Sequence, residues 1–453
     1  MLNFIKVACF IEESRIMKMK ALGIDIGTTT ISAVVMDMDT QKVEKAYTIN
    51  NNSFLAAGHV WERLQNPAVI IVKAKNLVDS ILEEYTEIER IGMTGQMHGI
   101  VYLDKEGSAI SPLYTWQDRR CDEKCFDGKC ISQIIEEKTG KTVPTGYGLA
   151  THIYNLKVGS VPQNAVQICT IMDYLGMVLT GEKRPLVHSS NAASLGFYDA
   201  EAGCFVKEDL ERLGVDIGIL PTVTEYFTFL GEYRGRLVSV AIGDNQASFL
   251  GAVYDMENSV LVNIGTGGQI SVLSDHCFMA ENIEARPFVK GRYLLAGSSL
   301  CGGRAYATLE KFFKTYAEVA GMGNIDHYAV MERFLESRTE EEKLMVDTRF
   351  SGTRSDSERR GKIENISTEN FTPAALIYGV LDGMAEELYD MYHIIVVGIG
   401  KKKTKLIASG NGIRKNKWLQ NIMSQKFQMT LQLAEYEEEA AVGAVRSATL
   451  ANK

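Results

Sequence analysis

GIDIGTTT, at residues 23–30, has a second copy in the chain, NIGTGGQ at residues 263–269. In each copy an apolar run with β-branched residues leads into a small Gly-Thr turn and a second such run follows, which predicts a strand, a tight turn and another strand. The shared letters, DIGT and NIGT, begin at positions 25 and 263, so the copies lie 238 residues apart in a chain of 453. A unit that returns at about half the chain length indicates two halves of related architecture.

Helix and strand patterns alternate around the two copies. We expect helices where apolar residues recur three and four positions apart, at residues 69–86, 165–181, 304–319, 373–395 and 416–427. Residues 88–104 are expected to form a strand, a glycine-rich turn and a strand, and residues 236–253 a buried strand that becomes helical after the loop at 243–245. This alternation predicts layered α/β domains, and we place the boundary between them near residues 251–258.

Composition limits both the partners and the setting of the protein. The chain carries 48 Lys and Arg against 57 Asp and Glu, a net charge of −9, which argues against a general nucleic-acid binder because such a protein needs a basic surface. The 8 cysteines are scattered and no secretion signal precedes them, so we expect a cytoplasmic setting. No apolar run reaches the roughly 18 residues of a membrane span. Residues 1–19 are expected to be an N-terminal extension, with the folded part beginning near Met17 or Met19.

The two Gly-Thr turns are candidate phosphate-binding loops. Small residues let backbone N–H groups approach phosphate oxygens, and threonine hydroxyls add donors without bulk. Asp25 lies in the predicted strand just before the first turn, where a carboxylate is placed to hold a divalent cation such as Mg²⁺. An ordinary hairpin turn is the alternative interpretation, and the presence of two copies makes it less favoured.

Three further segments are candidates for substrate binding and catalysis. GQMHG at 95–99 puts His98 in a glycine-rich turn after a predicted strand, where open α/β sheets bind ligands, although a lone histidine is often structural. YTWQDRR at 114–120 combines aromatic and planar polar groups, which suits a sugar and equally a surface loop with ion pairs. In IGDNQAS at 242–248, Asp244 is placed to accept a proton from a substrate hydroxyl or simply to cap a helix.

The remaining polar segments give one more candidate. SGNGIRKNKWLQ at 409–420 leads a glycine turn into a helix, which suits a nucleotide or a phosphate at the helix N-terminus. Cys121, Cys125 and Cys130 fit no common zinc spacing and are interpreted as incidental thiols. RSDSERRGK at 354–362 is interpreted from its charges alone as a solvated loop.

Taken in chain order, these motifs resemble those of the FGGY carbohydrate kinases. They are GIDIGTTT (23–30), GQMHG (95–99), TWQDRR (115–120), GDNQAS (243–248), NIGTGGQ (263–269) and SGNG (409–412). The resemblance covers roughly residues 20–449 and includes FSGTRSDSERRGKIENI at 350–366, where Arg354, Arg360 and Gly361 match that family's C-domain loop. It implies a two-domain, actin-like ATPase fold with duplicated ribonuclease-H-like cores and an active-site cleft between the domains. The sugar-binding domain would then be residues 20–251 and the ATP-binding domain residues 252–453.

Four segments look like the sedoheptulokinase branch of this family. They are PTGYGLAT (144–151), TIMDYLGMVLTGEKRP (170–185), SNAASLGFYD (190–199) and SLCGGRAYATL (299–309). GQMHG is shared with xylulokinases and does not separate the two branches. The family's usual Lys-x-x-Trp element is replaced by THIYNLK at 151–157, with Tyr154 near the place of the tryptophan, which puts sugar contacts through that segment in doubt.

The resemblance also implies a role for each candidate residue. Asp244 would be the general base that takes a proton from the sugar, and Asp25 would organise Mg²⁺. The sugar contacts would be Met97, His98, Trp116, Asp118, Asn191 and Asn245, and the ATP contacts would be Gly27, Thr28, Thr29, Gly265, Thr266, Gly267, Gly410, Gly412 and Asn416.

The expected function is therefore an ATP-dependent sugar kinase that converts sedoheptulose to sedoheptulose 7-phosphate. A xylulokinase or another ketose or polyol kinase is the first alternative. An actin-like or chaperone-like ATPase and an inactive sugar sensor are alternatives from other classes. The expected partners are a small-molecule sugar and ATP, without nucleic acid or membrane, and a homodimer is left open.

Overall fold

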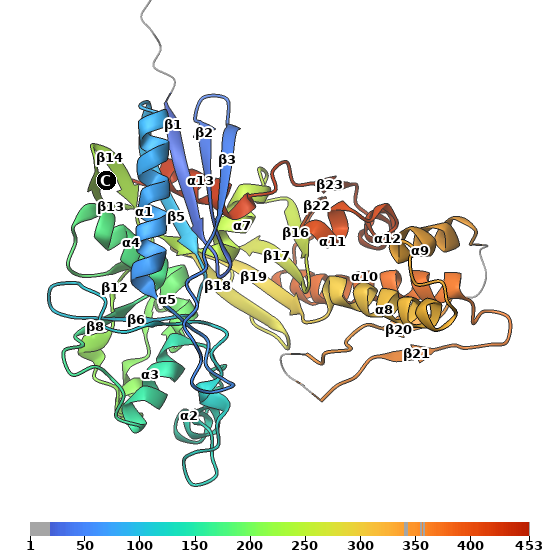
Figure 1. Cartoon of the computed structure of the whole chain (residues 1–453), viewed down its shortest axis with the longest axis horizontal. Coiled ribbons are helices and arrows are strands. Elements are labelled where there is room, and N and C mark those ends of the chain that lie inside the picture. The colour runs from blue at the N-terminus through green and yellow to red at the C-terminus, as the bar shows by residue number, and fades with distance from the viewer. Residues whose placement is uncertain (1–18, 339–342, 354–355, 357, 453) are drawn as a thin grey trace, which may run out of the picture.

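The fold is described by a computed structural model that covers residues 19–338, 343–353, 356 and 358–452. The expected N-terminal extension falls outside these residues except for Met19, and so does Arg354 of the expected C-domain loop. The described chain is α/β throughout, and two large sheets flanked by helices dominate it (Figure 1). In the described ranges, no helix combines the length and the apolar character needed to cross a membrane.

The first sheet has seven strands in the order β13-β14-β5-β1-β2-β3, with β15 also paired to β5. Its strands are β1 (Lys20–Ile26), β2 (Thr30–Asp37), β3 (Lys42–Asn50), β5 (Ile88–Gly95), β13 (Phe229–Tyr233), β14 (Arg236–Ser239) and β15 (Ile242–Gly243). β1 runs antiparallel to β2 and parallel to β5. The predicted turn after Ile26 is therefore confirmed as the connection of an antiparallel pair.

The second sheet repeats this pairing. Its order is β18-β19-β17-β16-β22-β23, formed by β16 (Ser259–Ile264), β17 (Gly268–Ser274), β18 (Ile283–Val289), β19 (Arg292–Ser299), β22 (Lys405–Ser409) and β23 (Leu431–Leu433). β16 runs antiparallel to β17 across the second Gly-Thr turn and parallel to β22, as β1 does to β2 and β5. The duplication predicted from the repeated turn is confirmed by this shared topology.

The helices are α1 (Pro67–Glu84), α2 (Ile131–Thr139), α3 (Gly148–Lys157), α4 (Ile171–Thr180), α5 (Ser189–Leu195), α6 (Lys207–Arg212), α7 (Asp244–Ala252), α8 (Gly302–Val319), α9 (His327–Glu336), α10 (Pro373–Ile399), α11 (Asn411–Arg414), α12 (Lys417–Phe427) and α13 (Glu439–Leu450). Two-stranded sheets join β4 (Leu64–Gln65) to β7 (Leu113–Tyr114), β6 (Val101–Leu103) to β8 (Gln167–Cys169), β9 (Leu186–His188) to β12 (Thr222–Thr224), β10 (Tyr198–Asp199) to β11 (Cys204–Phe205), and β20 (Met345–Asp347) to β21 (Lys362–Glu364).

One predicted helix starts later than expected. The prediction of a helix from residue 165 is wrong at its beginning, because Gln167–Cys169 form β8 and pair antiparallel with β6. The helix α4 starts only after Thr170, whose hydroxyl accepts a hydrogen bond from the Asp173 backbone N–H at 3.3 Å. Its end is confirmed, since Gly181 closes α4 in the left-handed conformation with φ 77°. Pairing with a distant strand therefore overrides the helical spacing of the first residues.

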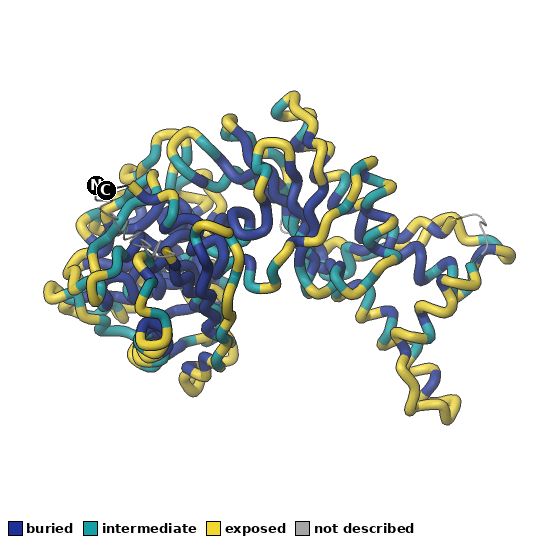
Figure 2. The backbone as a smooth tube through the Cα atoms, turned by 90° about the horizontal axis from the view of Figure 1, so that it is seen from above, coloured by how far each residue is buried: buried dark blue, intermediate teal, exposed yellow. Residues whose placement is uncertain are grey.

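Buried apolar residues form two main clusters, one from each sheet and its helices, and Figure 2 shows the buried residues along the backbone in dark blue. Strand alternation sends Leu22, Ile24 and Ile26 of β1 into the first cluster, together with α1. Ala21, on the opposite face, joins a separate cluster with Val445 and other residues of α13. The last helix of the chain therefore packs on the first sheet (Figure 1), and Asp25 lies on the same face of β1 as Ala21.

The expected domain limits, residues 20–251 and 252–453, stay a prediction.

The crossing of α13 over α7 gives a prediction about stability. A Cβ added at Gly443 of α13 would lie 1.8 Å from the carbonyl oxygen of Ala247 in α7, so the two backbones are in direct contact. We expect Gly443→Ala to lower the free energy of unfolding by about 2–3 kcal/mol, because the helices must separate. Chemical denaturation measures this, with Gly323→Ala as the control, where the new methyl would meet Glu318 Cγ at an ordinary 3.4 Å. Equal stability of the two variants would contradict the close crossing.

Candidate active site

Three parallel strands end at the same edge of the first sheet. In the ladder, Ile26 of β1 pairs with Gly95 of β5, and Gly95 pairs with Gly243 of β15. Asp25 precedes this row by one residue, and Asp244 follows it by one residue. The two carboxylates therefore come from strands on either side of β5, at the carboxyl edge where open α/β sheets bind ligands.

Asp25 lies where two helices begin. Asp244 is the first residue of α7, and Glu438 immediately precedes α13. Burial, and then the negative charges of Asp244 and Glu438, raise the pKa of Asp25 to about 7. Asp25 accepts no hydrogen bond to its side chain from any described residue. A poorly partnered carboxylate in this setting fits a divalent cation, whose charge would favour its ionised form.

The protein offers such a cation few ligands. Within the described ranges, no three His, Cys, Asp or Glu side chains are grouped so that they could hold a metal ion by themselves. Mg²⁺ typically keeps water and phosphate oxygens and takes only one or two carboxylates from a protein. The donor set around Asp25 therefore suits a cation that is bound together with a phosphate, and the metal role of Asp25 stays a prediction.

Asp244 is the first residue of α7 and does not act as its cap. The N-cap of α7 is Gly243, so the alternative interpretation of Asp244 as a cap is not supported. Asn245 Nδ2 donates to Asp244 Oδ1 at 2.6 Å, and Arg286 Nη1 donates to Asn245 Oδ1, also at 2.6 Å. Burial raises the pKa of Asp244 above its ordinary value, against the opposing effects of Asn245 and Arg286. A raised pKa makes the ionised carboxylate a stronger proton acceptor.

Helix α5 holds the strand that leads to Asp244. The Gly243 backbone N–H donates to Ser190 Oγ at 2.9 Å, and Asn191 Nδ2 donates to the carbonyl oxygen of Ala241 at 3.1 Å. Asn191 is 0% exposed. The structure thus gives Asn191 a role in holding the backbone, and its expected contact with the sugar stays a prediction.

Hydrogen bonds from three side chains hold the first Gly-Thr turn. Asn51 Nδ2 donates to the Gly27 carbonyl oxygen at 2.9 Å, and Gln65 Nε2 donates to that of Thr28 at 2.8 Å. The indole N–H of Trp116 donates to Thr28 Oγ1 at 3.1 Å. Trp116 is nonetheless 47% exposed, and the side chain of Thr29 is also exposed. The candidate phosphate loop and an expected sugar contact are therefore neighbours in the folded chain.

His98 is held in an unusual backbone conformation. Its φ is 73°, which is uncommon for a residue other than glycine. Its backbone N–H donates to Ser194 Oγ at 3.2 Å, and its ring Nδ1 lies 2.8 Å from the Ser194 carbonyl oxygen. The ring stacks on Tyr147 with centroids 4.3 Å apart. Ser194 and Tyr147 belong to two of the four segments with the branch resemblance, so those segments shape the surroundings of His98.

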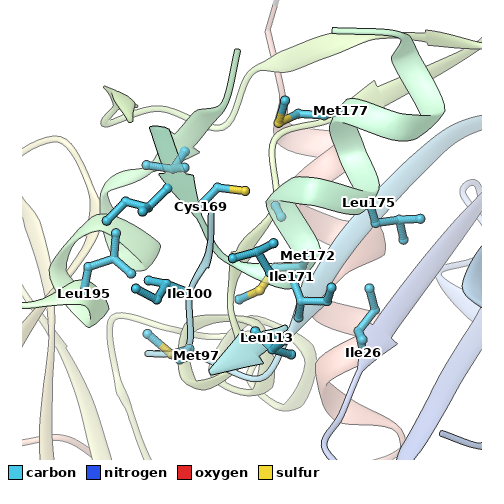
Figure 3. Packing of buried hydrophobic residues seen from close by; sticks show 14 of the residues in the cluster. Ile26, Met97, Ile100, Leu113, Cys169, Ile171, Met172, Leu175, Met177 and Leu195 are labelled. Carbon is cyan, nitrogen blue, oxygen red and sulfur yellow. The ribbon is translucent and has the colours of Figure 1, made fainter. Parts of the chain in front are cut away.

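Met97 is buried next to Asn245. It is 5% exposed and packs among core residues that include Ile100 and Leu113 (Figure 3). Its thioether sulfur lies 3.7 Å from Asn245 Nδ2. Met97 therefore supports the residue that bonds Asp244, and only a small part of its side chain can reach a ligand.

Asp118 is buried in an ion pair. It is 0% exposed, and Arg120 donates to both of its oxygens, through Nε at 2.7 Å and Nη2 at 3.1 Å. The guanidinium of Arg120 lies 4.4 Å from the ring centroid of Tyr114 and 5.6 Å from that of Tyr154, the residue near the family's tryptophan. Asp118 thus stabilises the loop that carries Trp116, and its expected contact with the sugar stays a prediction.

A cavity of about 780 Å³ lies beside the second Gly-Thr turn. The residues around it include Gly265, Thr266, Gly303, Arg304, Tyr306, Tyr328, Glu332, Gly412 and Asn416. A Cβ at Gly303 would lie 2.4 Å from the Gly265 carbonyl oxygen, so the turn rests directly on the N-terminus of α8. A helix N-terminus beside a glycine turn favours phosphate, and the volume is typical of a small-molecule site. The cavity therefore fits a nucleotide.

Four of the six second-half residues predicted for ATP line this cavity. They are Gly265, Thr266, Gly412 and Asn416, whereas Gly267 and Gly410 are not among its lining residues. Asn416 also caps α12, since its Oδ1 accepts from the Leu419 backbone N–H at 2.9 Å.

The two turns are not chemically equivalent. The second copy has Asn263 in the position of Asp25, and Asn263 Nδ2 donates to Ser409 Oγ at 2.8 Å. The carboxylates thus belong to the first sheet, and the cavity belongs to the second.

Sequence reasoning missed several residues of this region. Arg286 and Glu438 approach Asp244 and Asp25 only through the packing of β18 and α13, and no local pattern marks them. The pair Gly302 and Gly303 before a helical run was a usable signal for the second phosphate loop, since it repeats the turn-to-helix pattern at 409–420.

Comparisons of the chain with known protein families and proteins agree with this arrangement of the site. The chain matches the N-terminal domain of the FGGY family of carbohydrate kinases over residues 20–261 and its C-terminal domain over residues 260–452. It is 24% identical to a sedoheptulokinase of Mus musculus, over 93% of this chain and 96% of that one. It is also 24% identical to a xylulose kinase of Staphylococcus xylosus, over 95% and 90% of the two chains.

Solved structures share the fold at lower identity. The crystal structure of a xylulose kinase from Rhodospirillum rubrum matches with a TM-score of 0.81 at 21% identity, covering 95% of this chain and 89% of that one. Both domains of one family are thus matched in order, on a two-domain, actin-like ATPase fold. The chain therefore belongs to the FGGY family of carbohydrate kinases and is an ATP-dependent sugar kinase.

Proposed function

We propose that this kinase transfers the γ-phosphate of ATP to a hydroxyl of sedoheptulose and so forms sedoheptulose 7-phosphate. The observation that carries the choice of sugar is the similarity to the mouse sedoheptulokinase, which extends over nearly the whole of both chains. The contacts of Tyr147 and Ser194 with His98 add support, because these residues come from segments that resemble the same branch.

In this mechanism Asp244 takes the proton of the attacking hydroxyl. Its Oδ1 accepts a hydrogen bond from Asn245, which leaves Oδ2 to face the substrate. A positioned base contributes typically about 10²- to 10⁴-fold to the rate. Phosphoryl transfer has a loose transition state, so most of the remaining catalysis comes from positioning and from neutralising phosphate charge.

The other candidate residues serve the phosphates and the nucleotide. Asp25 would hold Mg²⁺, which when bound neutralises charge on the phosphate oxygens. The turns at residues 27–29 and 265–267 would cradle the β- and γ-phosphates. The cavity beside α8 would receive the adenosine, with Gly412 and Asn416 along its wall.

Xylulose is the second candidate substrate. The GQMHG segment at 95–99, which xylulokinases share, and the similarity to the Staphylococcus xylosus enzyme favour it. The two sugars differ in chain length, so a pocket that contacts the additional hydroxyl groups separates them by transition-state binding.

The assay that separates these candidates measures ADP formation with a panel of ketoses of five to seven carbons. We expect kcat/KM to be at least about tenfold higher for sedoheptulose than for xylulose, because unpaired polar groups in the pocket penalise the shorter sugar. Higher kcat/KM for xylulose would establish the second candidate. ADP formation at the same rate without any sugar would contradict both and favour an ATPase.

A further inference from the structure

Arg286 connects the second half of the chain to the catalytic residues of the first. It lies on β18 of the second sheet, and its Nη1 donates to Asn245 Oδ1 at 2.6 Å. Asn245 in turn donates through Nδ2 to Asp244 Oδ1 at 2.6 Å. The three side chains therefore form a continuous hydrogen-bonded series that ends on the proposed base.

The chemistry of the guanidinium determines the orientation of the Asn245 amide. Arginine has only donors, so Asn245 must turn its oxygen toward Arg286 and its NH₂ toward Asp244. An amide turned the other way would place its oxygen against the carboxylate of Asp244, which also has only acceptors when ionised. Arg286 thereby ensures that one oxygen of Asp244 is occupied and that the other remains for the substrate.

Arg286 is itself held in place. Its Nε and Nη2 donate to Glu284 Oε2 at 3.0 and 2.9 Å, and its side chain is only 12% exposed. The next residue, Pro287, accepts a hydrogen bond at its carbonyl oxygen from Gln246 Nε2 at 2.8 Å. β18 is therefore joined to the first turn of α7 at two consecutive positions, and the guanidinium is preorganised.

We propose that Arg286 is a positioning residue for phosphoryl transfer, which acts through Asn245 to hold the carboxylate of Asp244 in its reactive orientation. The inference rests on the proposed function, since it takes Asp244 as the base that receives the sugar proton. It adds that the base is correctly oriented only when β18 of the second half lies against α7 of the first.

The first test compares kcat with KM in Arg286→Gln. We expect kcat to fall by about 10- to 100-fold, because small errors in the placement of a catalytic group are costly, while KM for sugar and ATP changes by less than about threefold. Arg286→Lys keeps a positively charged donor but loses the planar guanidinium that reaches Asn245 and Glu284 together, so it should give an intermediate kcat. Arg292→Gln is the matched control, because Arg292 on the adjacent strand β19 pairs with Glu257 and Asp275 and with no residue of α7 in the described ranges. Its kcat should stay within about twofold of the wild type.

The second test is a double-mutant cycle with Asn245→Ala. If Arg286 acts through Asn245, adding Arg286→Gln to Asn245→Ala should lower kcat by less than about a further twofold. A full, additive loss in the double variant would overturn the inference, since Arg286 would then act independently of Asn245. Should Arg286→Gln not fold, as judged by circular dichroism, Arg286→Lys is compared in the same two backgrounds.

The outcomes for the two proposals are distinct. A wild-type enzyme that phosphorylates no ketose defeats the proposed function. An active wild type together with an equally active Arg286→Gln variant defeats only the role of Arg286. A rise in the sugar KM with unchanged kcat would also overturn it, because that pattern indicates a direct substrate contact.

Discussion

Asp244→Asn is expected to lower kcat by at least about a hundredfold, while the affinity for the sugar falls far less. The asparagine side chain has nearly the same shape as aspartate but cannot take the proton of the attacking hydroxyl. The hydrogen bond that the Gly243 backbone N–H donates to Ser190 Oγ and the packing of α7 do not involve the lost carboxylate, so the fold should persist. Steady-state kinetics give kcat, and calorimetric titration gives the sugar affinity.

The control for this variant is Asp275→Asn. Asp275 is an exposed carboxylate that pairs with Arg292 and lies outside the site. Its kcat should stay within about twofold of the wild-type value. A nearly normal kcat in Asp244→Asn would show that another group, or none, accepts the proton.

Asp25→Asn is expected to reduce kcat by roughly a hundredfold and yet to make the ligand-free protein more stable at high pH. The loss of activity follows because the amide cannot supply the charge that holds the cation. The gain in stability follows because burial and the neighbouring Asp244 and Glu438 raise the pKa of Asp25 from 3.8 to about 7. Ionising Asp25 is therefore harder in the folded protein than in the unfolded chain.

The sign of this effect can be measured by thermal unfolding. A carboxyl whose pKa is raised by folding lowers the free energy of unfolding progressively as the pH rises from about 4 to about 7. Without Mg²⁺, we expect Tm of Asp25→Asn to exceed that of the wild type by roughly 2–4 °C at pH 8, and by less at pH 5. Asp39→Asn, at an exposed carboxylate after β2, should show no such pH-dependent gain. A lower Tm of Asp25→Asn at pH 8 would mean that the folded protein stabilises the charge.

Much of the fold was predictable from local patterns. The repeated turn at residues 23–30 and 263–269 predicted two related halves, and both sheets repeat the antiparallel and parallel pairing around it. Asp25 and Asp244 could be selected because each stands beside a strand end, and parallel strands end at one edge. The start of α4 was not predictable, because residues 167–169 pair with a strand more than sixty positions away.

Burial and long-range contacts are the features of the candidate site that the sequence did not predict. The family resemblance implied sugar contacts for Asp118 and Asn191, but the sequence does not show that the ion pair with Arg120 and the packing of α5 bury these two side chains. Arg286 stands in an ordinary strand 41 residues after Asn245, and only the docking of β18 on α7 brings the two together. Such contacts follow from tertiary packing, which periodicity does not encode.

The most direct test of Asp244 as the proton acceptor is its distance from the substrate in a crystal structure with the ketose and a non-hydrolysable ATP analogue. We expect the hydroxyl that receives the phosphate to lie within roughly 2.6–3.2 Å of an Asp244 carboxylate oxygen. In the same structure the terminal phosphate should face the Gly-Thr turns. A sugar bound with its reacting hydroxyl far from Asp244, and next to another base, would show that Asp244 is not the proton acceptor.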